Sequence, residues 1–184
     1  MASNANFISQ FVMGGDPCTY KESGELQAEM SKLTHPARPD VDWRQVEKLC
    51  LALFRQNGVE LQTLVCYVLG ITRRQGLAGM ADGLGSLDIL LQRWADFWPV
   101  QVHSRISLLS WVTEKMQQAL RTLDIQYQDL PQIYRCVQHL SAIETTLQQC
   151  ELWHMTKLDL LAGQFRNTAL RLERLAPQGA ETTI

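Results

Sequence analysis

Apolar residues recur every three or four positions along most of this chain, and that spacing constrains its fold more than any other feature. One series fits the i, i+3, i+4, i+7, i+8 pattern of a helix face without a miss: Leu61, Leu64, Val65, Val68 and Leu69. No alternating run carries the turn chemistry of a strand pair. We therefore expect an all-α protein, a bundle of about six or seven antiparallel helices with a long C-terminal helical stretch.

Prolines, glycines and capping residues divide the N-terminal part of this pattern. A first helix is expected over Thr19–Leu33. An extended linker follows at His35–Asp40, because prolines cannot occupy a helix interior. Asp42 lies three residues before Gln45, which is capping-box spacing, and so begins a second helix. The third helix follows at once and is broken by the glycines of residues 76–79.

A fourth helix is expected from Met80 to Trp98, ended by Pro99. Its apolar residues step by four and three, and they should be mostly buried at Leu84, Leu87, Leu91 and Trp94. Gly83 and Gly85 lie within it, although each costs about 1 kcal/mol relative to alanine in a helix. Close approach of another helix is a reason to tolerate that cost.

The C-terminal part is less sharply divided. Ser104 can cap a fifth helix, and Asp129 with Pro131 is typical of a new helix start. From there to Leu175 the chain has no proline, so the pattern fits either one very long helix or two with a break near residues 150–156. Both interpretations remain open from the sequence.

Composition narrows the class of protein. The apolar fraction is 46% and the charged fraction 20%, which indicates a packed core rather than disorder. The net charge of -2 argues against nucleic-acid binding and against an anionic membrane surface. No apolar run is long enough to span a membrane, and no secretory signal is present. The odd count of five scattered cysteines indicates reduced, buried thiols and a cytoplasmic location.

No residue pattern predicts a catalytic, cofactor or metal site. Glu151 and His154 form half of a di-iron helix motif, but the second Glu-x-x-His is absent. Cys136 with His139, and Cys150 with His154, lack the CxxC spacing of structural zinc sites. We therefore expect no metal, no cofactor and no enzymatic activity, and a protein that works by binding other proteins.

Four residues are candidates for such an interface. Trp111 and Trp153 lie off the main apolar stripes of their helices, and tryptophan is frequent at protein interfaces. Leu160 and Leu170 also fall outside the apolar series of the C-terminal stretch. A helix that is apolar on a second side must cover it, either with another copy or partner or by folding back as a hairpin.

Residues 40–99 resemble a known family, the ImpA-type N-terminal domain of bacterial type VI secretion proteins. An acidic–Trp–x–x–Val opening, a glycine–leucine turn and a closing tryptophan before proline carry the resemblance: Asp42, Trp43, Val46, Gly76, Leu77, Gly79, Gly83, Leu84, Trp94, Trp98 and Pro99. The continuation to about residue 175 is more similar to the VasL/TagA branch than to TssA. Met80 replaces a usual leucine, and the histidine often found before the proline is absent.

The resemblance implies a non-enzymatic assembly or anchoring component of the type VI secretion system. TssA-like members organise baseplate and sheath assembly, and TagA-like members hold the far end of the sheath. Sheath, baseplate or membrane-complex proteins are then the expected partners, and a homo-oligomer is compatible with this role. Longer members of this branch carry a hydrophobic C-terminal part, which would place the protein at the inner face of the inner membrane. The alternative is a generic helical adaptor of another cytoplasmic complex, although no repeat supports it.

The expected domain organisation follows from these elements. Residues 1–18 form a flexible N-terminus, and residues 19–125 form the ImpA-type helical domain. Residues 126–176 form a C-terminal extension or hairpin, and residues 177–184 form a linker or tail.

Overall fold

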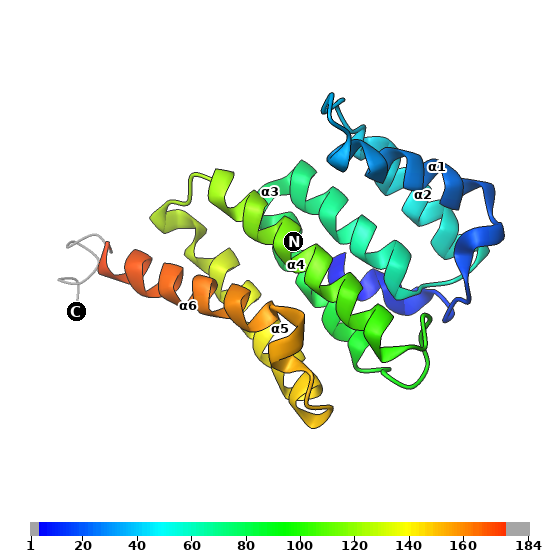
Figure 1. The fold of residues 1–184 in the computed structure, drawn as a ribbon. Coiled ribbons are helices and arrows are strands. Elements are labelled where there is room, and N and C mark those ends of the chain that lie inside the picture. The colour runs from blue at the N-terminus through cyan, green and yellow to red at the C-terminus, as the bar shows by residue number, and fades with distance from the viewer. Residues whose placement is uncertain (1–3, 176–184) are drawn as a thin grey trace.

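The computed structural model describes residues 4–175, and these contain six α-helices and no β-strand (Figure 1). The helices are α1 (Lys21–Ser31), α2 (Trp43–Gln56), α3 (Leu61–Leu91), α4 (Val102–Thr122), α5 (Leu130–Gln149) and α6 (Leu158–Arg174). Five short 3-10 helices join them: η1 (Asn4–Gln10), η2 (Pro17–Thr19), η3 (Lys32–Thr34), η4 (Tyr127–Asp129) and η5 (Trp153–Thr156). The all-α prediction is confirmed. The tail expected at residues 177–184 lies outside the described residues.

Helix α3 is the centre of the bundle. It packs against α2, α4, α5 and η1, and most of its side chains are buried on every side. In Figure 1, α1 and α2 lie on one side of α3 and α4, and α5 and α6 lie on the other. A helix that is apolar all round can be stable only when other elements enclose it, as they do here.

The predicted break at residues 76–79 is present as a sharp kink inside α3. Gly76 has φ 62° and ψ −134°, a conformation that glycine adopts at little steric cost. The two arms on either side then pack against each other: a Cβ atom at Gly83 would lie 2.7 Å from Cγ1 of Val68. This contact is the close helix approach that the sequence predicted for Gly83.

Helix α3 ends at Leu91, so the predicted continuation to Trp98 is wrong. Residues 92–101 form turns, and the side chain of Arg105 in α4 binds the backbone of these turns. Its buried guanidinium donates to the carbonyl oxygens of Trp94, Phe97 and Pro99, and it lies over the rings of the first two. The periodic spacing continues past the helix because Phe97 and Pro99 are buried in the turn instead. Leu84, Leu87 and Leu91 are buried as predicted, whereas Trp94 and Trp98 are only half-buried.

The N-terminal segment differs from the sequence-based expectation. Within residues 4–18 the chain forms η1 and η2, and Ile8 is buried against the core. The rings of Phe7 and Tyr67 lie 5.3 Å apart, and those of Phe11 and Phe54 lie 5.7 Å apart. About two turns of 3-10 helix are too short to show an α-helical apolar period, so the sequence carried no regular signal there.

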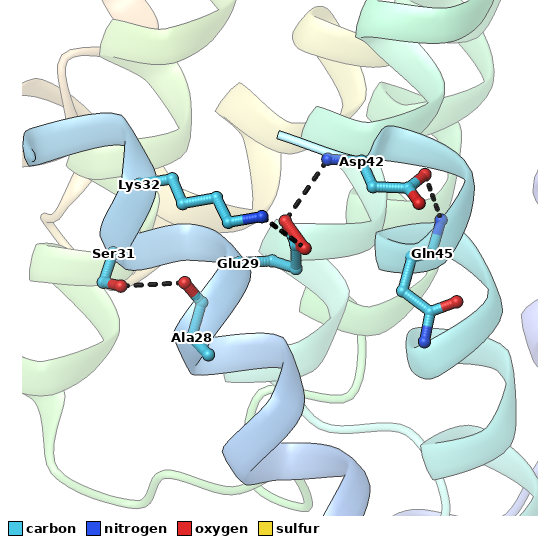
Figure 2. A network of polar contacts seen from close by, with 6 residues as sticks. All are labelled: Ala28, Glu29, Ser31, Lys32, Asp42 and Gln45. Atoms are coloured by element: carbon cyan, nitrogen blue, oxygen red, sulfur yellow. Dashed lines mark hydrogen bonds and ion pairs between the residues drawn. The ribbon is translucent and has the colours of Figure 1, made fainter. Parts of the chain in front are cut away.

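The predicted start of α2 is confirmed in part. The Asp42 carboxylate accepts a hydrogen bond from the Gln45 backbone N–H at 3.1 Å (Figure 2). The other half of the capping box is replaced, because the Asp42 N–H donates to Glu29 of α1 at 3.2 Å. The predicted cap at Ser104 is wrong, because helix α4 begins at Val102. The helix start predicted at Asp129 is confirmed in position, since Asp129 is the N-cap residue of α5 and Pro131 lies in its first turn, but the Asp129 carboxylate accepts from the Gln126 N–H and does not cap α5.

The C-terminal stretch is two helices rather than one. Helices α5 and α6 are joined by η5, and Lys157 takes a left-handed conformation directly before α6. Helix α6 packs on α5 and α4 through Leu161, Phe165 and Leu172. The break lies at residues 150–157, where the sequence placed it.

Candidate interaction surface

A groove opens between α1 and α4, with the first arm of α3 as its floor. Its volume is about 360 Å³, and eight side chains line it: Gln27, Met30, Ser31, Gln62, Val65, Cys66, Leu108 and Trp111. We call this the α1–α4 groove. Five of these side chains are apolar, at least one from each of the three helices, and the other three are glutamine or serine. This combination of apolar lining with a few polar groups is typical of binding sites.

The groove continues along α4 toward its N-terminus. A second hollow of about 330 Å³ shares Gln62 and Leu108 with the first and reaches Trp98 and Ser107. The two half-buried tryptophans, Trp111 and Trp98, therefore line two neighbouring hollows that share Gln62 and Leu108. Half-buried tryptophans in a pocket are the side chains that most often dominate protein–protein binding energy.

The structure separates the four predicted interface residues. Trp111 lines the α1–α4 groove and is half-buried, as expected of an interface residue in an unbound protein. Leu160 and Leu170 of α6 are 57% and 54% exposed. Trp153 is only 4% exposed because η5 folds beneath α4 and α6. The prediction that Trp153 contacts a partner is wrong, since the hairpin arrangement buries it within the chain.

The residues that carried the family resemblance lie in three places. Asp42, Trp43 and Val46 form the first turn of α2, where Val46 is fully buried. The glycine–leucine group of Gly76, Leu77, Gly79, Gly83 and Leu84 forms the kink of α3 and the packing of its second arm. Trp94, Trp98 and Pro99 lie in the turns above Arg105. Of this set, Trp98 and Pro99 line the candidate interaction surface.

The cysteines are arranged mainly as core residues. Cys50, Cys66 and Cys136 are buried, and burial raises the pKa of the Cys66 and Cys136 thiols to about 12. The expectation of buried thiols is wrong for Cys18, which is exposed, and for Cys150, which is half-buried. In residues 4–175 no three His, Cys, Asp or Glu side chains are grouped closely enough to hold a metal ion.

One carboxyl group is buried next to this surface. Glu60 caps α3 and is fully buried, with both carboxylate oxygens accepting from the Thr63 N–H at 3.0 and 3.2 Å. Burial raises the pKa of Glu60 to about 7, and the hydrogen bond from Thr63 opposes that shift only in part. Its role is local: it fixes the start of the helix that forms the groove floor.

Sequence reasoning missed most of the groove. Leu108 was not singled out, although it lies three residues before Trp111 and forms a second apolar ridge on α4. Met30 of α1 forms both core and groove wall. The sequence does show a second row of apolar residues beside the main apolar face of α4, and that row could have indicated the groove.

Of three comparisons with known proteins, one finds a match, and that match includes this surface. No curated protein and no solved structure matches the chain. In the described part of the chain, no helix is long and apolar enough to cross a membrane. A family model described as ImpA, N-terminal, type VI secretion system, matches residues 9–114, a span that includes every residue lining the α1–α4 groove and its extension. Because this match covers more than half of the chain, the protein belongs to the ImpA N-terminal domain family of the type VI secretion system.

Proposed function

We propose that this protein is a non-enzymatic assembly or anchoring component of the type VI secretion system, and that it binds another protein of that machine through the α1–α4 groove. One observation carries the proposal. The groove is built entirely from residues 9–114, the segment that matches the secretion family. The groove is open to solvent and five of its eight lining side chains are apolar, which supports a binding surface rather than an enclosed reaction site.

The shape of the groove favours an apolar helix of a partner. It lies between two helices and above a third, which is the arrangement that receives an amphipathic helix in helix-in-groove recognition. Leu108 and Trp111 on one wall and Met30 on the other offer contacts to side chains spaced one turn apart. Gln27, Ser31 and Gln62 can pair with polar groups at the edges of that helix.

The finer assignment rests on the resemblance described above. We propose a TssA-like role, closest to the VasL/TagA branch, with sheath, baseplate or membrane-complex proteins as partners at the inner face of the inner membrane. Residues 19–125 would act as the partner-binding domain and residues 126–176 as its helical extension. The exposed Leu160 and Leu170 on that extension support a second role, contact between copies of this chain. A generic helical adaptor is the alternative, and it predicts no binding to secretion-system proteins.

The test uses separately purified sheath, baseplate and membrane-complex proteins from the same secretion cluster. Each is titrated against the full chain by surface plasmon resonance. We expect one of them to bind, and Trp111→Ala to weaken that binding by at least about tenfold, as for a central interface tryptophan. Ser107→Arg places a long charged side chain in the hollow beside the groove from an exposed position, so it should also weaken the binding of a helix that reaches this hollow, without disturbing the core.

Tyr134→Ala is the matched control, because it removes an exposed aromatic ring from α5, outside the groove. Thermal melting establishes that each variant is folded. Equal affinity for wild type and Trp111→Ala would contradict the groove as the binding surface. Absence of binding to every protein of the cluster would contradict the type VI role itself.

A further inference from the structure

A basic pocket lies at the turn between α1 and α2, on residues that the α1–α4 groove does not use. Its volume is about 480 Å³. Three cationic side chains line it, Lys32, Arg38 and Arg73, with a single carboxylate, Asp40. Trp43 and Leu33 form part of its apolar lining. We call this group of residues the basic pocket.

Two of the three cations have no carboxylate partner. Lys32 pairs with Glu29 at 2.8 Å, which Figure 2 shows beside the start of α2. Over residues 4–175, Arg38 and Arg73 form no ion pair, and no acceptor binds their side-chain N–H groups. An arginine carries five N–H donors in a planar fork that matches a carboxylate. The pocket therefore presents unused donors to a ligand.

Contacts fix the guanidinium of Arg73 and the backbone of Arg38 at the pocket, and both arginines are exposed. The guanidinium carbon of Arg73 lies 5.4 Å from the ring centroid of Trp43, a cation–π contact across the pocket wall. Arg38 has φ 47°, which is uncommon for a residue other than glycine. Hydrogen bonds hold that turn: the Arg38 N–H donates to the carbonyl of His35, and the Ala37 N–H donates to its ring, both at 3.0 Å.

We propose that the basic pocket binds an acidic peptide segment of another protein, in which a glutamate or aspartate lies next to an apolar residue. The carboxylate would bind Arg38 and Arg73, and the apolar neighbour would pack on Trp43 and Leu33. Asp40 in the same wall opposes a multiply charged anion, so a single carboxylate fits better than a phosphate. The net charge of -2 gives no long-range attraction for nucleic acid. The inference does not depend on the groove or on the type VI role.

The test is an NMR titration of the full ¹⁵N-labelled chain with two small probes. Acetyl-Leu-Glu-Leu-amide carries the carboxylate, and acetyl-Leu-Gln-Leu-amide is its neutral match. We expect the first to shift the Trp43 indole N–H signal in a saturable way. The second should bind at least about fivefold more weakly, because it cannot form charge-assisted hydrogen bonds.

Variants locate the binding. Arg38→Gln and Arg73→Gln should each weaken the binding of the glutamate probe, and Arg121→Gln, the same change at an exposed arginine of α4, should not. Equal binding of the two probes, or equal binding to all three variants, would overturn the proposal. Saturable binding of inorganic phosphate that Arg73→Gln abolishes, without binding of the glutamate probe, would overturn it in favour of a phosphate site.

Discussion

Val68 and Gly83 lie in direct contact where the two arms of α3 cross: a Cβ atom on the glycine would be 2.7 Å from Cγ1 of the valine. That distance is shorter than any comfortable carbon–carbon contact. Both residues are buried, and the valine is β-branched, so its side chain has few other rotamers to adopt. The absence of a side chain at residue 83 is therefore what lets the arms pack at this separation.

We predict that Gly83→Ala is destabilised by overpacking of the core at a cost of about 1–3 kcal/mol, of which a gain of about 1 kcal/mol in helix propensity offsets a part. Gly163→Ala is the control, because nothing lies within 4 Å of its added Cβ atom in α6. That variant should gain about 1 kcal/mol from helix propensity. Urea titration of both variants measures the free energies of unfolding. Equal effects at the two sites would show that the arms can separate without cost.

Arg105 gives the second prediction. Its buried guanidinium binds the carbonyl oxygens of Trp94, Phe97 and Pro99, so its removal leaves three acceptors without their partner. Each unsatisfied buried group costs about 1–3 kcal/mol, and we expect Arg105→Met to lose at least about 3 kcal/mol. Arg105→Lys should recover little, because an ammonium cannot reproduce the planar fork. Arg121→Gln is the exposed control, and denaturant unfolding is the measurement. A loss below about 0.5 kcal/mol in Arg105→Met, the size of an ordinary surface effect, would contradict the role of Arg105.

The comparison of sequence and structure shows what apolar spacing can and cannot predict. It identified every long helix, because α-helical periodicity persists over several turns. It extended α3 too far because Trp94 and Phe97 keep the period while their carbonyl oxygens turn toward Arg105. A long-range contact of this kind leaves no local pattern. The ordered η1 segment was missed for a related reason: Phe7 and Phe11 pack on α2 and α3, which are distant in sequence.

Glu60 predicts a specific dependence of stability on pH. Its pKa is about 7 in the folded protein, against an ordinary value of 4.5. The folded state therefore binds this proton more tightly than the unfolded state. The protonated Glu60 therefore contributes to the free energy of unfolding. This contribution is complete below pH 4.5 and is lost as the pH rises to about 7. The difference corresponds to roughly 3 kcal/mol, so stability should fall across that window.

Glu60→Gln isolates this effect, because a glutamine oxygen can still accept from the Thr63 N–H but does not titrate. We expect the variant to be more stable than wild type at pH 8 and to lose the slope between pH 4.5 and 7. The free energy of unfolding measured at several pH values gives both curves. If the curves of unfolding free energy against pH are parallel for the two proteins, the Glu60 carboxyl group remains charged in the folded state or is accessible to water there.

The candidate site was less predictable than the fold. Trp111 was identified because it lies off the main stripe of α4, but the same argument failed for Trp153, which η5 buries. A residue that lies off a stripe can face solvent or face a neighbouring turn, and the turn is decided by tertiary structure. Met30 and Gln62 line the groove only because the fold brings α1, α3 and α4 around it, and one-dimensional patterns do not encode that arrangement.

The exposed leucines of α6 give the last prediction. Leu160 and Leu170 are more than half exposed, whereas Leu161, Phe165 and Leu172 on the same helix are buried. If Leu160 and Leu170 mediate contact between copies, Leu160→Glu with Leu170→Glu should lower the mass measured by light scattering. Their exposure in the single chain means that folding should be unaffected, to within about 0.5 kcal/mol, as for ordinary surface changes. Trp153→Ala should instead lower the free energy of unfolding by about 3–5 kcal/mol, because it empties a buried site. An unchanged mass in the double-glutamate variant, with folding intact, would contradict α6 as a contact between copies.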